Sequence, residues 1–181
     1  MSGSTDTRTV RPSLVGRTLF WILALGFTLA TLLTMSALPP VVASHFDAAG
    51  APNGWSSRSG YVTLLLAVGV GVPGGVIALV HGLTQRGPDL LNVPSRGYWR
   101  LPAHRDEAVR RVRAYMWWLG CLMTATALAV HCLVLQAQAV QPPHLSTRGI
   151  VVVLSSLLAA VAGWVAGWYW VLRPPAESRP S

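Results

Sequence analysis

Residues 150–172 read IVVVLSSLLAAVAGWVAGWYWVL, an unbroken run of 23 residues without a charged side chain. A helix needs about 20 predominantly apolar residues to cross the roughly 30 Å hydrocarbon core of a bilayer. Three further uncharged stretches of similar length lie at 19–38, 61–83 and 114–135. The chain is therefore predicted to form four transmembrane helices.

The composition of the whole chain supports this interpretation. Hydrophobic residues make up 52% of the 181 residues and charged residues only 11%, whereas a soluble domain carries about 25% charged residues. None of the four stretches alternates polar and apolar residues with the period of two that a membrane-spanning strand requires. We expect an all-α, polytopic integral membrane protein, a four-transmembrane-helix bundle.

Arginines are distributed unevenly between the segments that flank these spans. We divide the chain into a tail at 1–18, a membrane domain at 19–172 with an outer loop at 39–60 and an inner loop at 84–113, and a tail at 173–181. With the N-terminus inside, twelve arginines face the cytoplasm and two face outward. Because cytoplasmic loops carry the excess of basic residues, we expect a multi-pass protein of the bacterial inner membrane with both termini cytoplasmic.

A cleaved signal peptide is the alternative interpretation of the first span. A cleaved signal peptide has an apolar run of about 7–15 residues, so the longer run at 19–38 favours a retained helix.

Small residues at four-residue spacing let helix backbones approach closely. We expect packing within the bundle, with a homo-oligomer or a mobile kink at Pro73 as alternatives; the small residues are Gly69, Gly71, Gly74, Gly75, Ala159, Gly163 and Gly167.

The outer loop carries turn signals and two bulky aromatic residues. Pro52-Asn53-Gly54 indicates a turn, because proline presets φ and Asn-Gly accepts positive φ. Asp47 followed by Gly50 suggests a second turn that a side chain caps. With few charges, this loop is expected to fold back on the outer surface of the bundle and to meet a ligand or partner. The residues proposed for that contact are His45, Phe46, Asp47, Gly50, Asn53, Gly54 and Trp55.

The inner loop ends in a charged helix that leads into the third span. Pro102 suits a first helical position, and Asp106–Arg110 and Glu107–Arg111 have the spacing of i,i+4 ion pairs. We expect this segment to lie at the membrane surface, where each arginine gains about 1 kcal/mol from anionic lipid. A protein-partner site is the alternative. The arginines concerned are Arg105, Arg110, Arg111 and Arg113.

These two loops resemble a known family. The pattern of His45-Phe46-Asp47, Gly50 and Asn53-Gly54-Trp55 is similar to the N-terminal domain, of unknown function, of the SdpI-like family of bacterial membrane proteins. The inner-loop residues Asn92, Pro94, Tyr98-Trp99, Pro102 and Arg105 look like the segment that follows that domain. The resemblance covers about residues 20–120. It implies immunity to a secreted peptide toxin and signalling of the toxin's presence. Asp47 stands where many members have Asn.

Ionisable residues near the outer face are candidates for a metal or proton site. His45, Asp47, His131 and His144 carry the imidazole and carboxylate groups that bind Zn²⁺, and histidine also titrates near physiological pH. Only His45-x-Asp47 has a ligand-type spacing. The simpler interpretation is that Asp47 caps a turn, His45 packs in the loop and His144 is solvated. His131 is the more unusual residue, because ionisable groups within a span are costly.

Several functional classes have no support in the sequence. Motifs for phosphate loops, zinc peptidases, nucleophile elbows and Cys-x-x-Cys redox sites are missing, so we expect no enzyme and no cofactor. The net charge of +8 is spread between spans rather than gathered in one stripe, so nucleic acid is not an expected partner. The expected partners are the lipid bilayer and either a peptide toxin or another membrane protein. A small oligomeric transporter or channel component, or an accessory subunit of a membrane complex, is the alternative.

Overall fold

The computed structural model describes residues 7–86 and 93–175, with side chains at 14–85 and 93–175. Asn92, part of the family resemblance, lies outside these residues, as do residues 1–6 and 176–181 of the two tails. The elements in chain order are α1 (Thr7–Thr34), the short helix η1 (Met35–Ala37), β1 (Val41–Phe46), β2 (Pro52–Ser57), α2 (Arg58–Leu66), the π-helical η2 (Ala67–Gly71), α3 (Val72–Arg86), α4 (Arg96–Trp99), α5 (Pro102–Gln138) and α6 (Thr147–Val171).

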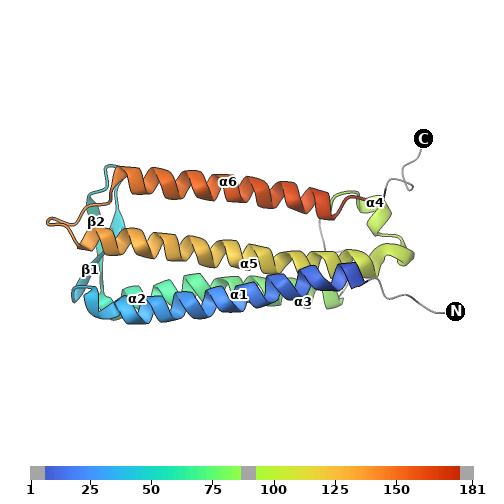
Figure 1. Cartoon of the computed structure of the whole chain (residues 1–181), viewed down its shortest axis with the longest axis horizontal. Coiled ribbons are helices and arrows are strands. Elements are labelled where there is room, and N and C mark those ends of the chain that lie inside the picture. Colours follow the sequence, from blue (N-terminus) through green and yellow to red (C-terminus); the bar gives the residue numbers. More distant parts are fainter. Residues whose placement is uncertain (1–6, 87–92, 176–181) are drawn as a thin grey trace.

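Four helices are long and apolar enough to cross a membrane, so the predicted all-α bundle of four spans is confirmed. They are Leu14–Ala37, Arg58–Gln85, Pro102–Gln138 and Thr147–Val171. The start of α1 and the end of α6 lie at one end of the bundle, and the two strands lie at the other (Figure 1). We call the end that holds the start of α1, the end of α6 and the short helix α4 the loop end (Figure 1). The end that holds β1 and β2 is the hairpin end. Which end faces the cytoplasm stays a prediction.

The helix α5 is longer than a membrane requires. Its 37 residues rise about 55 Å at 1.5 Å per residue, whereas the hydrocarbon core is roughly 30 Å thick. Pro102 occupies the start of α5, as predicted. The charged first turns of α5 therefore extend beyond the spanning part at the loop end.

The loop at 39–60 forms an antiparallel β-hairpin, which the sequence did not predict. The predicted turn at Pro52-Asn53-Gly54 is wrong, because these residues belong to strand β2, where Gly54 pairs with His45. A Cβ at Gly54 would lie 2.9 Å from the His45 Cβ. Gly54 therefore serves close approach between strands across a bulge rather than a change of chain direction.

The second span is interrupted ahead of Pro73, where a kink was predicted. The π-helical segment η2 lies between α2 and α3. Proline has no N–H, so in an α-helical register the carbonyl four residues earlier, that of Gly69, has no helical donor. The hydroxyl of Thr124 on α5 donates to the Gly69 oxygen at 2.8 Å. A neighbouring helix thus satisfies a backbone group that lipid could not.

Gly69 also marks the closest packing of three spans. A Cβ at this position would overlap the Phe27 ring from α1 and lie 3.1 Å from the Ala127 Cβ of α5. Gly167 likewise faces the Tyr115 hydroxyl. By contrast, an added Cβ at Gly71, Gly74, Gly75 or Gly163 would meet no atom within 4 Å. The small residues thus serve packing inside the bundle at some of the predicted positions only.

The fourth span stands apart from the others along much of its length. In Figure 1, α6 lies along one side of α5, away from α1. The Tyr115 hydroxyl donates to the Trp164 carbonyl at 2.6 Å near the loop end, and Gly149 packs against Leu133 near the hairpin end. Between these contacts lies an apolar groove of about 350 Å³, lined by residues of α2, η2, α5 and α6.

Candidate functional site

The tip of the hairpin is an ordered turn built by Asp47. Its carboxylate accepts hydrogen bonds from the backbone N–H groups of Ala49 and Ala51, both at 2.9 Å. Gly50 completes the turn with φ of +87°, a conformation that favours glycine. The predicted capped turn at Asp47–Gly50 is therefore confirmed, with Asp47 Oδ1 accepting from both backbone donors.

Two segments distant in sequence fasten this hairpin to the bundle. The Leu145 N–H, from the connection between α5 and α6, donates to the Gly50 carbonyl at 2.9 Å. The Gln138 side chain, at the end of α5, bonds both backbone groups of Ala43. Its amide donates to the Ala43 carbonyl at 3.1 Å and accepts from the Ala43 N–H at 3.3 Å. Gln138 thus bonds β1 as a neighbouring strand would.

A recess of about 430 Å³ opens between the hairpin and the helix ends. Ligand sites in proteins are typically concave and mostly apolar, with a few polar groups that fix orientation. Polar and apolar groups share the walls of this recess about equally, and none of the lining side chains is charged. They are Ala37, Leu38, Pro39, Val41, Trp55, Gln138, Gln141 and Pro143. Trp55 keeps 53% of its surface exposed at the rim.

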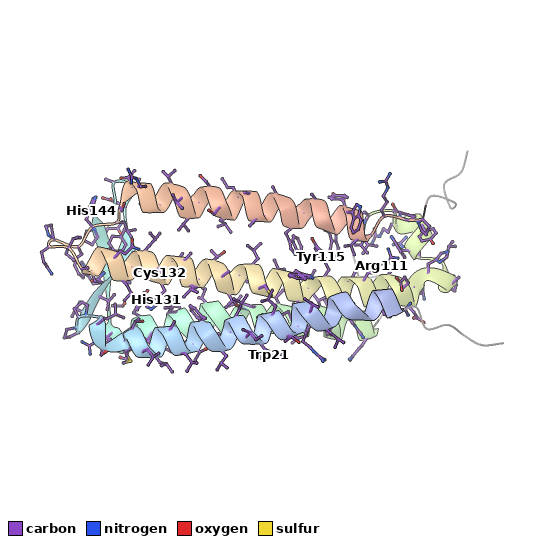
Figure 2. The ribbon with its side chains drawn as sticks, in the orientation of Figure 1. Trp21, Arg111, Tyr115, His131, Cys132 and His144 are labelled. Carbon is purple, nitrogen blue, oxygen red and sulfur yellow. The ribbon has the colours of Figure 1, made fainter. Side chains whose placement is uncertain are left out.

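A buried histidine lies below the hairpin and joins three helices. The His131 side chain, on α5, is 1% exposed. Its Nε2 lies 2.8 Å from Thr34 Oγ1 of α1, and its Nδ1 lies 3.1 Å from the Tyr61 hydroxyl of α2. Figure 2 shows His131 on α5 near the hairpin end.

We assign the direction of each bond in this chain by placing the proton of the Thr34 hydroxyl, so that every group is paired. The Thr34 hydroxyl donates to the Ala30 carbonyl at 2.7 Å, so its oxygen accepts from His131 Nε2–H. A neutral imidazole carries one proton, so Nδ1 is an acceptor and receives the Tyr61 O–H. The chain runs from Tyr61 through His131 and Thr34 to Ala30, with every hydroxyl and ring nitrogen paired.

The four candidate metal ligands are not brought together. His45 is exposed and its Nδ1 lies 3.1 Å from the Ser44 hydroxyl. His144 packs near Gly50, where a Cβ would lie 3.2 Å from its Cε1, while His131 is buried among the helices. Among the residues that the structure describes, no three His, Cys, Asp or Glu side chains could share a metal ion. The arrangement instead matches the simpler interpretation of Asp47 as a turn cap.

Other residues of the predicted contact surface have divided roles. The half-buried Phe46 packs on the cluster of Phe27, Leu38, Val42 and Tyr61. Asn53 is exposed on β2, as is Trp55. The surface therefore presents Asn53 and Trp55, whereas Phe46 anchors the hairpin.

At the loop end, the predicted lipid-binding arginines are partly engaged within the protein. Arg111 donates from Nη1 to the Val171 carbonyl at 2.8 Å, pairs with Glu107 at 2.6 Å, and stacks 5.2 Å from the Trp99 ring centre. Arg113 donates to the Thr84 hydroxyl at 2.7 Å. Arg105 is half-buried, as are Arg111 and Arg113.

Arg110 is the exposed member of this group, with 64% of its side chain accessible. It pairs with Glu107, three residues earlier, rather than with Asp106 as the spacing predicted. The predicted Glu107–Arg111 pair is confirmed. Of the four arginines, Arg110 is thus the best placed to meet a lipid headgroup.

The sequence analysis missed Gln138, Tyr61 and Thr34, the residues that attach the hairpin to the helices. Each contact joins residues 70 to 97 positions apart, so local patterns do not reveal it. The one available signal was that Thr34 and Gln138 are polar residues at the ends of apolar spans.

Comparison with known families places a domain of unknown function, DUF1648, at residues 20–70. This segment contains most of α1, the whole hairpin, α2 and most of η2. Comparisons with curated proteins and with solved structures found no match. The chain is thus a multi-pass membrane protein in which the DUF1648 match covers the hairpin, most of the first span and the first half of the second.

Proposed function

We propose that this chain is a non-enzymatic protein of a bacterial inner membrane that binds a secreted peptide at its hairpin end, as an immunity or sensing protein. The observation that carries the proposal is the recess beside an ordered, fastened hairpin. A flexible loop would lose more conformational entropy on binding than this prepared surface does.

The chemistry of the recess suits a peptide segment that offers both an apolar or aromatic side chain and polar backbone groups. Its walls are aliphatic, proline and tryptophan residues with glutamine amides. The exposed Trp55 is of the residue type that most often dominates peptide and protein contacts. Glutamine amides at the wall suit hydrogen bonds to a peptide backbone.

The arginine distribution supports the proposed orientation. Twelve of the fourteen arginines would lie on the cytoplasmic side if the hairpin end faces outward. Cysteine labelling tests this in whole cells, in a background with Cys121 and Cys132 replaced. A membrane-impermeant maleimide should label the hairpin variant Asn53→Cys and spare the loop-end variant Ala103→Cys. The reverse pattern would invert the topology and remove the proposal.

The resemblance to the SdpI-like family supports the kind of ligand. The matched domain at residues 20–70 includes the hairpin residues on which that resemblance rests. In that family the best-known members give a producing cell immunity to its own toxin. Carried to this chain, the resemblance makes a secreted peptide toxin the proposed ligand.

A susceptibility assay tests the function directly. Cells lacking the gene should become more sensitive to at least one member of a panel of secreted bacterial peptide toxins. The wild-type gene should restore resistance, and Trp55→Ala should not. Trp170→Ala is the matched control, because Trp170 is 75% exposed but lies at the other end of the molecule.

Unchanged susceptibility across the panel would refute the immunity role. Solute flux through proteoliposomes that contain the purified protein as a stable oligomer would then favour a transporter or channel component. Copurification with another membrane protein, without flux, would favour an accessory subunit.

A further inference from the structure

The buried His131 holds the two chain segments that enter and leave the hairpin. Thr34 is the last residue of α1, seven residues before β1, and Tyr61 lies four residues after β2. Both side chains bond to the same imidazole. One ring on α5 therefore fixes both bases of the hairpin, while Gln138, two turns further along α5, holds the strand β1 itself.

Only a neutral imidazole satisfies this chain of hydrogen bonds. The Tyr61 O–H donates to Nδ1, and Nδ1 must be unprotonated to accept it. A proton on Nδ1 would set two donors against each other and would turn the Tyr61 hydroxyl proton away from the acceptor that it has in the structure. The added charge would also lie in a site that is 1% exposed to solvent, where charge is strongly disfavoured.

The groups that face His131 offer no compensation for such a charge. Thr34 faces it from α1 and Tyr61 from α2, and both are neutral. Its neighbour on α5 is Cys132, whose thiol is neutral too when protonated. The spans 19–38, 61–83, 114–135 and 150–172 contain no Asp or Glu, and the described residues form no ion pair with the ring.

We propose that His131 is a proton-operated latch on the hairpin: the neutral ring holds Thr34 and Tyr61 together, and protonation releases them and loosens the hairpin. Because the hairpin forms the ligand surface under the proposed function, ligand binding at that surface would weaken in acid. The latch itself does not require the ligand to be a toxin.

Hydrogen exchange of the hairpin amides tests the latch on the full chain in lipid nanodiscs. Exchange at residues 41–57 is compared between about pH 7.5 and about pH 5, the interval in which histidines titrate. The key variant is His131→Gln. Its amide oxygen can accept from Tyr61, its N–H can donate to Thr34, and it takes up no proton. Comparison at equal pH removes the intrinsic effect of pH on exchange.

The wild type should lose protection in acid relative to His131→Gln, by up to about tenfold per pH unit if opening takes up one proton. The control is the double variant His45→Gln/His144→Gln, which removes the other hairpin-end histidines and should respond as the wild type does. Protection in the wild type that is independent of pH would overturn the latch. So would a response that the double variant abolishes.

A second variant tests the latch if the first one does not fold. If His131→Gln fails to fold, Tyr61→Phe replaces it, because the loss of the hydroxyl should raise hairpin exchange at both pH values. Unchanged exchange in Tyr61→Phe would overturn the latch. Because exchange is measured without ligand, its outcome is separate from the toxin assay, and either proposal can fail alone.

Discussion

The hydrogen bond from the Thr124 hydroxyl to the Gly69 carbonyl offers a direct test of how the helices of this bundle are held together. Replacing Thr124 by Val keeps the shape of the side chain and removes the hydroxyl that donates at 2.8 Å. Thr124 is 1% exposed, so water does not replace it. The variant therefore leaves one buried carbonyl without this donor and creates no cavity.

The expected loss of stability follows from two known ranges of free energy, one for unpaired buried groups and one for hydrogen bonds between membrane helices. A buried group left without its partner costs about 1–3 kcal/mol. Hydrogen bonds between helices in a membrane average about 0.6 kcal/mol and reach about 1.7 kcal/mol. Because Pro73 removes the helical donor for the Gly69 carbonyl, Thr124→Val should lie toward the upper end, at about 1–2 kcal/mol.

Proline supplies the second arm of the test. In Pro73→Ala the restored N–H can donate to the Gly69 carbonyl within the helix. Thr124→Val should then cost much less, and the double-mutant cycle should show a coupling of about 1 kcal/mol. Thr126→Val is the matched control, because its hydroxyl donates to the Leu122 carbonyl of its own helix at 2.8 Å.

The free energy of unfolding is measured by denaturant titration of the purified protein in mixed micelles, followed by tryptophan fluorescence. Equal losses for Thr124→Val and Thr126→Val would contradict the reasoning, because only the former joins two spans. A cost of Thr124→Val that is unchanged by Pro73→Ala would show that the proline does not create the need for the outside donor.

Three further predictions use the same unfolding measurement. Gly69→Ala should destabilise the bundle by about 1–3 kcal/mol because its methyl group overlaps neighbouring helices, whereas Gly71→Ala, which meets open space, should change little. Gln138→Leu removes two hydrogen bonds to β1 and should cost about 1–3 kcal/mol, with faster amide exchange confined to the hairpin; unchanged exchange there would count against Gln138 as its anchor. Arg111→Lys should cost about 1–2 kcal/mol because a lysine does not reproduce its stacked and forked contacts, while the exposed Arg110→Lys should lie within about 0.5 kcal/mol of the wild type.

The spans were predictable because the bilayer imposes one rule on every residue of a crossing segment. A helix such as 150–172 must be apolar on all sides and about 20 residues long, and both properties can be read locally. The Asp47–Gly50 turn was predictable for a similar reason, since its carboxylate bonds to amides two and four residues away. Where a structure depends on neighbours in sequence, the sequence sufficed.

The hairpin could not be predicted from the sequence because the contacts that hold it join residues far apart in the chain. Pro52-Asn53-Gly54 has the composition of a turn, yet the chain had already turned at Asp47. What keeps these residues in a strand is pairing with Phe46 and His45 and attachment through Ala43 to Gln138. Turn propensity depends on neighbouring residues only, so it takes no account of this strand pairing or of the attachment to Gln138.

One part of the site was nonetheless present in the sequence as a pattern. Thr124, His131 and Gln138 recur every seven residues along α5, so they lie on one face, about 10 Å apart. In lipid, polar side chains turn toward the protein interior, so this stripe marks the face that α5 presents to its neighbours. An apolar stripe marks the buried face of a soluble helix, and here a polar one does so.

The partners of this stripe reveal how the matched domain is completed. Thr124 bonds Gly69, His131 bonds Thr34 and Tyr61, and Gln138 bonds Ala43. Every one of these partners falls within residues 20–70, the segment that matches DUF1648, whereas α5 lies wholly outside it. In this chain, α5 therefore supplies partners for a π-helix carbonyl, for the side chains of Thr34 and Tyr61, and for the backbone of Ala43, all within the matched segment.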